Sequence, residues 1–281
     1  MKNITIVTGA NSGIGFETAK ALAKDERTLF LICRTEEKAN IAAEKIKAAL
    51  QGELNADILG FACDFSSQKQ IRALAEKIKS KAESVSILVN NAGAIFPNRE
   101  LTEDGLEKTF AVNHLGYFLL TLLLERELKQ LERSRVVSVA SEASRVGVLE
   151  FEDLSLEKSF SSIRAYGQSK LMNILFAFAL ARKWKENGVT STVMHPGGVN
   201  TGFGEGDFGL VGSLFKLAKP FFRTPEKGAE TVIWLAKSAE VEGISGKYFQ
   251  DLKEIQPISM AKDIALQEKL WELSLELVKL K

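Results

Sequence analysis

Short apolar runs alternate with longer helical patterns along this chain, and this alternation limits the available folds more than any other feature. The runs at 3–7 and 28–33, "NITIV" and "TLFLIC", are followed by helical patterns at 13–25 and 36–51. Strands that alternate with helices of this length favour βαβ units around a parallel sheet. We therefore expect an α/β fold with a doubly wound parallel sheet in three layers, α/β/α.

The later part of the chain continues this pattern. Further strands are expected within 57–64, 86–93, 135–141 and 190–198, with a last one near 246–250. No linker, repeat or low-complexity stretch interrupts the sequence, so we expect one domain over 1–281. A C-terminal helix is expected at about 262–281. Its leucine stripe is too short to claim a coiled coil, so we expect it to pack on its own domain, with a homo-oligomer left open.

Composition excludes several classes of protein. The 37 Lys and Arg residues against 36 Asp and Glu leave a net charge of +1, which gives no basic field for nucleic acid. No stretch reaches the roughly 18 apolar residues of a spanning helix, which leaves only peripheral membrane contact open. Cys33 and Cys63 lie in apolar runs and no signal-like segment is found, so we expect a reduced, cytoplasmic protein. His114 and His195 lack metal-ligand spacing, and we expect no metal.

The stretch "TGANSGIG", residues 8–15, follows the first expected strand directly. Its glycines, Gly9, Gly13 and Gly15, open the next helical pattern. A helix N-terminus offers unpaired N–H groups, and glycines allow the pyrophosphate of a dinucleotide to approach the backbone. The alternative is a tight strand-to-helix turn without a ligand.

The spacing of this loop and five further motifs resemble the short-chain dehydrogenase/reductase family. These motifs are "NNAG" at 90–93, Asn113 in "VNHLGYF", Ser141 at a strand end, "YGQSK" at 166–170 and "HPGGVNT" at 195–201. The stretches "CRTEEK", "AYGQSKLMNILF" and "LWELS" are similar to its retinol dehydrogenase and WW-domain oxidoreductase branch. The resemblance implies a Rossmann fold, a nicotinamide dinucleotide and oxidoreductase activity.

The resemblance also implies which residues contact the cofactor. Those expected in the glycine loop are Gly9, Asn11, Ser12, Gly13, Ile14 and Gly15. Those expected near the adenosine are Asp64, Phe65, Asn90, Ala92 and Gly93. Those expected near the nicotinamide end are Tyr166, Lys170, Pro196, Gly197, Val199 and Thr201.

Arg34 ends the second expected strand, where dinucleotide folds often carry an acidic residue for the adenosine ribose. A cation at this position suits a 2′-phosphate, with Lys38 and Ser12 able to assist, so we expect NADP(H). Two alternatives stay open. Arg34 could be a solvated surface charge, and Glu36 or Glu37 could turn inward.

Tyr166 and Lys170 are four residues apart in a helical pattern, so their side chains lie on one helix face. An ammonium beside a phenol favours the phenolate, and we expect a lowered pKa for Tyr166. Taken alone, the pair is better explained as an exposed tyrosine and lysine on an amphipathic helix, but the glycine loop upstream reverses this preference.

The resemblance implies that Ser141 orients the substrate oxygen, that Tyr166 exchanges its proton, and that Asn113 holds a water linking Lys170 to solvent. Taken alone, Asn113 could be a core amide that needs a hydrogen-bond partner. Ser138 and Ser144 are rivals of Ser141 on sequence grounds. We expect both histidines to be structural, because no G-x-S-x-G elbow accompanies them.

The segment 202–224 carries glycines followed by apolar residues at helical spacing with a cationic side. We expect a lid over an apolar substrate, with membrane contact or packing on the core as alternatives.

These features together predict an NADP(H)-dependent oxidoreductase that interconverts a hydrophobic aldehyde or ketone and its alcohol. The main alternative is a sensor or scaffold that binds NADP(H) without turnover. A third alternative, a nucleotide-sugar epimerase or dehydratase, would usually need a longer C-terminal substrate region.

Overall fold

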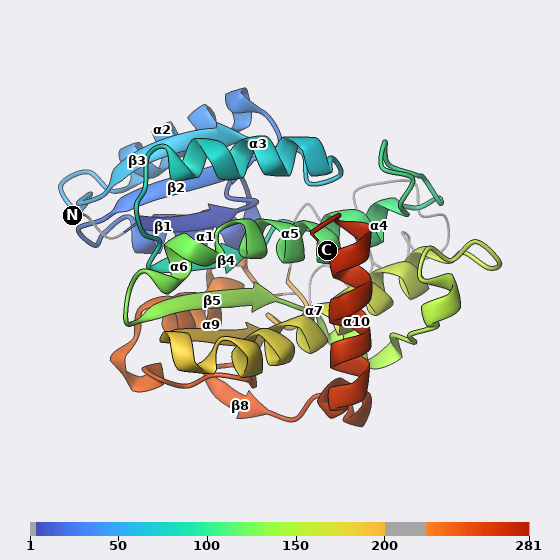
Figure 1. The fold of residues 1–281 in the computed structure, drawn as a ribbon. Helices are drawn as coiled ribbons and strands as arrows, with labels where there is room; N and C mark the ends of the chain where they lie inside the picture. Colours follow the sequence, from blue (N-terminus) through green and yellow to red (C-terminus); the bar gives the residue numbers. More distant parts are fainter. Residues whose placement is uncertain (1–3, 200–222, 281) are drawn as a thin grey trace.

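The computed structural model describes residues 4–199 and 223–280, in which eight strands form one sheet (Figure 1). The strand order is β3-β2-β1-β4-β5-β6-β7-β8, and every pairing is parallel except that of β7 with β8. The strands are β1 (Ile4–Thr8), β2 (Thr28–Cys33), β3 (Asp57–Ala62), β4 (Ile87–Asn90), β5 (Ser134–Val139), β6 (Val189–Met194), β7 (Lys247–Gln250) and β8 (Lys253–Ile255).

Helices cover both faces of the sheet (Figure 1). One face packs on α1 (Gly13–Leu22), α2 (Glu36–Ala49) and α9 (Pro225–Lys237). The other packs on α3 (Gln68–Lys79), α5 (Gly116–Leu123) and α7 (Ser162–Lys183), with α10 (Ile264–Leu277) lying against α7. The short helices are α4 (Lys108–Phe110) and α6 (Glu125–Lys129). The doubly wound α/β fold predicted from the sequence is therefore confirmed.

Local chemistry explains where several helices begin. The Thr35, Ser67 and Thr224 hydroxyls accept from backbone N–H groups in the first turns of α2, α3 and α9. Asp263 caps α10 in the same way, so this helix starts after 262 and ends at Leu277, inside the predicted range. Its packing on α7 agrees with the expectation that it covers the parent domain.

Each of the seven predicted strands is present, but β8 was not predicted. It has only three residues, "KEI", and two of them are charged and exposed, so no apolar alternation marks it. A tight turn joins it to β7, with Asp251 and Leu252 both at positive φ, as a type I′ hairpin turn requires.

The chain order reverses between β1 and β4, which lie side by side at the centre of the sheet. β2 and β3 continue to one side of β1, and β5 to β7 continue to the other side of β4. Ligands of doubly wound sheets bind beyond the carboxyl ends of the strands at such a switch point. The segments that follow β1 and β4 are the glycine loop and "NNAG", so the fold brings these two motifs together.

Candidate active site

Ser141, Tyr166 and Lys170 come together at the carboxyl end of β5. Ser141 follows this strand and starts a 3₁₀ turn, where its hydroxyl accepts from the Ala143 N–H at 3.2 Å. Tyr166 and Lys170 lie one turn apart on α7, and the Tyr166 phenol is hydrogen-bonded to Ser141. The Lys170 ammonium donates to the Val139 carbonyl oxygen at 3.0 Å and lies 5.6 Å from the centre of the Tyr166 ring. Ser138 lies within β5, so it is not the serine that meets Tyr166.

Burial controls the protonation of this pair. It raises the pKa of Tyr166 to about 12, opposed by the hydrogen bond from Ser141, and it lowers the pKa of Lys170 to about 7. The expectation that Lys170 lowers the pKa of Tyr166 is therefore wrong for the polypeptide by itself. Desolvation disfavours both charged forms, and the ammonium is bonded to Val139 rather than to the phenol.

Asn113 lies in a π-helical turn, Ala111–Leu115, between α4 and α5. Its side-chain oxygen accepts from the Ala94 N–H at 2.8 Å, and its amide donates to the Ala94 oxygen at 2.9 Å and to Ser169 Oγ at 3.0 Å. These bonds fix the chain just after "NNAG". A Cβ on Gly93 would lie 3.3 Å from Asn113 Oδ1 and 3.4 Å from Lys170 Nζ, so Gly93 sits directly against both. The relay water expected at Asn113 stays a prediction.

The glycine loop has the geometry that a dinucleotide needs, but two of its glycines also serve the fold. Gly9 and Gly13 adopt φ angles of +67° and +56°, which side-chain-bearing residues rarely adopt. A Cβ on Gly15 would lie 2.2 Å from the Gly9 oxygen, and one on Gly9 would lie 2.9 Å from Ala92 Cα. Both glycines therefore allow the loop and the end of β4 to approach each other. Ser12 precedes α1 in extended conformation, without a capping bond from its side chain.

The neighbours of these glycines differ in their exposure. Asn11 is half-buried and donates to Ser12 Oγ at 3.4 Å, whereas the Ile14 side chain is buried in the core. Any contact of Ile14 with a cofactor would therefore come from its backbone, at the N-terminus of α1 where N–H groups lack helical partners.

Thr8 and Asn91 join the ends of β1 and β4, and sequence reasoning assigned neither a role. The Thr8 hydroxyl donates to the Val89 oxygen and accepts from the Asn91 and Ala92 N–H groups at 2.8 and 2.9 Å. The Asn91 amide donates back to the Thr8 oxygen at 2.8 Å. Thr8 immediately precedes the glycine motif, and that position was the available signal.

Replacing Thr8 with Val should lower the free energy of unfolding by about 1–3 kcal/mol, because two backbone N–H groups lose their shared acceptor. Thr18 is the matched control: it is equally buried, and its hydroxyl has no hydrogen-bond partner within residues 4–199 and 223–280. Thr18→Val should change stability little. Urea unfolding of both variants measures the difference, and equal losses would contradict the assigned role of Thr8.

The residues expected near the adenosine divide into exposed and buried side chains. Arg34 and Lys38 are exposed just beyond β2, and no ion pair or hydrogen bond of the Arg34 side chain is found in the described part of the chain. Asp64 is half-buried and accepts from the N–H and the hydroxyl of Ser66. Phe65 turns inward, since a Cβ on Gly116 of α5 would lie 2.6 Å from its ring.

The Asn90 side chain is also directed into the core. It is fully buried and donates to Thr121 Oγ1 of α5 at 3.0 Å. The side chains of Asn90 and Phe65 therefore belong to the core, and only their backbones could meet a cofactor. Gly93 and the half-buried Ala92 remain beside the site.

The loop after β6 is held by His195. The backbone N–H of Gly197 donates to His195 Nδ1 at 3.2 Å, and Gly197 has a φ angle of +74°. Pro196 and Val199 are half-buried next to it. Burial lowers the pKa of both histidines, that of His114 to about 3, in agreement with their predicted structural roles. Thr201 and nearly all of the expected 202–224 lid lie outside the described residues.

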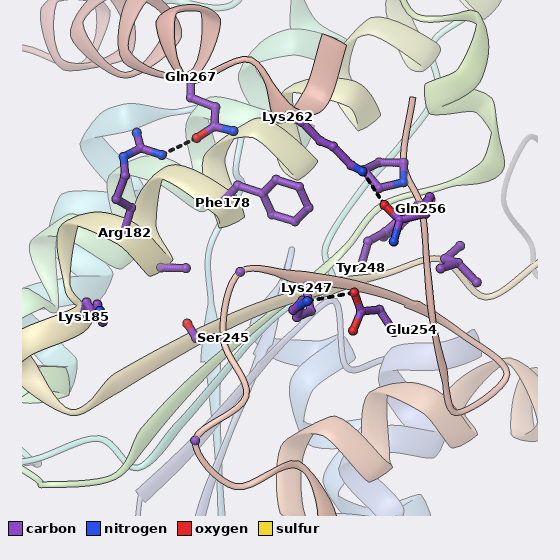
Figure 2. A pocket seen from close by; sticks show the side chains of 15 residues that line it. Phe178, Arg182, Lys185, Ser245, Lys247, Tyr248, Glu254, Gln256, Lys262 and Gln267 are labelled. Atoms are coloured by element: carbon purple, nitrogen blue, oxygen red, sulfur yellow. Dashed lines mark hydrogen bonds and ion pairs between the residues drawn. The ribbon is translucent and has the colours of Figure 1, made fainter. Parts of the chain in front are cut away.

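A pocket of about 600 Å³ lies between α7, β7 and β8, lined by other residues than those discussed above (Figure 2). Phe178 is one of its lining side chains. The lining also contains an ion pair between Lys247 and Glu254 and a hydrogen bond from Arg182 to Gln267. None of the expected catalytic or cofactor residues lines it. The described residues also contain no cluster of three or more His, Cys, Asp or Glu side chains able to hold a metal.

The comparison with protein families decides what kind of protein this is. A model described as short chain dehydrogenase matches residues 3–207. The chain belongs to this family. It is an oxidoreductase of the short-chain dehydrogenase family, which uses a nicotinamide cofactor and acts on alcohol or carbonyl groups.

Similar proteins place this dehydrogenase in the predicted branch. Retinol dehydrogenase 12 of Mus musculus is 39% identical over 275 residues, covering 98% of this chain and 86% of the mouse protein. WW domain-containing oxidoreductase of Gallus gallus is 39% identical over 284 residues, covering 98% of this chain and 68% of the chicken protein. The resemblance to this branch is confirmed.

Solved structures agree with the fold. An uncharacterised protein from Mycobacterium paratuberculosis superposes with a TM-score of 0.76 at 26% identity, covering 99% of this chain and 94% of the other. A protein from Beutenbergia cavernae described as a putative NAD(P)-dependent gluconate 5-dehydrogenase, with NADP bound at low occupancy, gives a TM-score of 0.67 at 23% identity, covering 88% of this chain and 94% of the other. Among the described helices of this dehydrogenase, none has the length and apolarity needed to cross a membrane.

Proposed function

We propose that this oxidoreductase interconverts a hydrophobic aldehyde or ketone and its alcohol with NADP(H), and that Tyr166 is the general acid and base. The observation that carries the proposal is the hydrogen-bonded pair of Ser141 and Tyr166 next to the buried Lys170. This group lies at the carboxyl edge of the sheet, beside the switch point of β1 and β4. A protein that only binds a nucleotide has no need of these three side chains together.

Each residue has a distinct task in the proposed reaction. When bound, the nicotinamide ring supplies or accepts a hydride at the substrate carbon. Tyr166 donates the phenolic proton to the substrate oxygen in reduction and takes it back in oxidation. The Ser141 hydroxyl holds that oxygen beside the phenol. Lys170 binds the nicotinamide ribose, and Asn113 supports the backbone next to it and holds the relay water.

The preference for NADP(H) is supported by Arg34. This exposed cation stands beyond β2, and the side chain has no partner within the described residues, so it is available to a 2′-phosphate. Lys38 and Ser12 lie on the adjoining helix starts. Gly9 and Gly13 supply the backbone shape for the pyrophosphate at the N-terminus of α1. The gluconate 5-dehydrogenase with bound NADP supports a cofactor of this type on this fold.

The apolar substrate class is supported by three exposed apolar side chains that lie near Ser141 and Tyr166 in the sequence. Val146 and Val148 follow Ser141 and are 60% and 47% exposed, and Ile163, three residues before Tyr166, is 42% exposed. If they form one contiguous apolar surface, they would suit an apolar substrate. The retinol dehydrogenase relatives support the same class. A cytoplasmic location is part of the proposal, supported by two buried cysteines that are free thiols.

The proposal is tested by NADPH consumption with a panel of aldehydes and ketones of increasing chain length, retinaldehyde included. We expect kcat/KM to rise with apolar chain length and NADPH to be used in preference to NADH. NADPH binding is measured separately by its fluorescence. Tight binding with no turnover on any carbonyl would reject the reaction and favour a nucleotide sensor.

A further inference from the structure

His195 connects two segments that meet at the reacting group. It follows β6, and its Nδ1 accepts the Gly197 N–H at 3.2 Å, which fixes the start of the 196–199 loop. On the other side of the ring, Nε2 lies 2.9 Å from Glu142 Oε2. Glu142 is the neighbour of Ser141, so one imidazole touches both the serine turn and the loop after β6.

The surroundings hold this imidazole in one orientation. The ring is 1% exposed and packs against the Tyr248 ring of β7, with ring centres 5.4 Å apart. The Tyr248 phenol is hydrogen-bonded to Ser144, in the same 3₁₀ turn as Glu142. A ring held between a strand and a turn has little freedom to flip, so Nδ1 stays bonded to the Gly197 N–H while Nε2 stays close to Glu142 without hydrogen-bond geometry.

Arg223 closes the loop from the opposite side. Its backbone N–H donates to the Gly198 oxygen at 2.8 Å, and its guanidinium packs on Gly197, where a Cβ would lie 3.2 Å from Cζ. The same guanidinium pairs with Asp251 in the turn between β7 and β8, with one N···O distance of 3.0 Å. The loop after β6 is therefore fixed at its first residues from two directions.

We propose that His195 is a positioning residue that couples the Ser141 turn to the 196–199 loop and thereby sets the affinity for the nicotinamide end of the cofactor. This inference rests on the proposed function, because that function places the nicotinamide beside the loop. The coupling requires an unprotonated Nδ1, since a protonated ring nitrogen cannot accept from Gly197. Burial favours the neutral ring by lowering its pKa, and Glu142 opposes this in part.

Two substitutions distinguish the roles of the two ring nitrogens. His195→Asn leaves an amide oxygen near the position of Nδ1, so the Gly197 N–H keeps an acceptor. His195→Gln reaches the position of Nε2 and leaves Gly197 without one. The dissociation constant is measured for NADP⁺ and for adenosine 2′,5′-bisphosphate, which lacks the nicotinamide end, and thermal unfolding checks that both variants fold.

We expect His195→Gln to weaken NADP⁺ binding about 5- to 10-fold, which is the effect of one lost hydrogen bond. The affinity for the bisphosphate should not change. His195→Asn should stay within about 2-fold of the unmodified protein for both ligands. Equal NADP⁺ affinities for the two variants would overturn the proposal. So would a parallel loss of bisphosphate binding, because the effect would then be a general disturbance of the fold.

A measurement without substitution covers the case in which His195→Gln does not fold. The chain has only two histidines, so ¹⁵N imidazole shifts can be assigned with one His114 variant. We expect neutral His195 with the proton on Nε2, and a proton on Nδ1 would overturn the coupling. Neither measurement uses turnover, so failure of the carbonyl reaction would be seen separately, as NADP⁺ binding without consumption of any substrate.

Discussion

Replacing Tyr166 with Phe should lower kcat for carbonyl reduction by about 10²- to 10⁴-fold, the usual contribution of a positioned general acid. The change removes one oxygen, which is the atom hydrogen-bonded to Ser141. The ring and its place 5.6 Å from the Lys170 ammonium remain, so NADPH binding should be nearly unchanged. Stopped-flow kinetics with saturating NADPH and the best aldehyde of the panel measures the loss.

Tyr117→Phe is the matched control for this prediction. The Tyr117 ring lies 5.8 Å from the same ammonium, and its buried hydroxyl has no hydrogen-bond partner among residues 4–199 and 223–280. We expect Tyr117→Phe to leave kcat within about 2-fold, because no hydrogen bond is lost. Similar losses in both variants would show that a general disturbance around Lys170, rather than proton transfer at Tyr166, lowers the rate.

Replacing Arg34 with Asp should weaken the binding of NADPH about 10- to 100-fold, while the binding of NADH should change little. Hydrogen bonds to a charged group are worth about 1.5–3 kcal/mol, and the new carboxylate would repel a 2′-phosphate. NADH has ribose hydroxyls at this position, and these can donate hydrogen bonds to a carboxylate. Fluorescence titration with both nucleotides gives the two dissociation constants.

Lys45→Asp controls for the change in overall charge. Lys45 is also exposed and lies on α2, but further from the end of β2 than Arg34 does. Its replacement alters the net charge equally and should leave the ratio of NADPH to NADH affinity close to that of the unmodified protein. Equal weakening of both nucleotides by Arg34→Asp would remove Arg34 from the explanation of cofactor choice.

Most of the sheet could be predicted from the sequence because its inner strands, β1, β2, β4, β5 and β6, are buried on both faces. In β2, for example, residues 29–33 are all apolar and buried, and this composition distinguishes a buried parallel strand from an amphipathic helix. The edge strand β8 was missed because its stability depends on pairing with β7 and on a tight turn, neither of which leaves an apolar pattern. Helix ends were predicted less well than helix centres: the helical patterns at 13–25 and 36–51 run past Leu22 and Ala49, where α1 and α2 end.

The residues that we propose to be catalytic could be found in the sequence because they lie in short local motifs. The direction and protonation of their side chains depend on tertiary packing. Asn90 and Phe65 were assigned to the adenosine site by position in a motif, yet both side chains pack towards α5. The pKa of Tyr166 was expected to fall next to Lys170. Instead it rises, because the desolvation of both groups depends on how deeply α7 is packed.

The close approach of Gly9, Gly15 and Ala92 has a consequence for evolution within this fold. Since a Cβ on Gly15 would collide with the Gly9 oxygen, selection for folding alone would retain both glycines in a descendant that no longer bound a nucleotide. Decay of function would then begin at residues that the fold can spare, such as the exposed Ser12 and Arg34. In such descendants, substitutions at these two positions would indicate lost activity earlier than substitutions in the glycine motif.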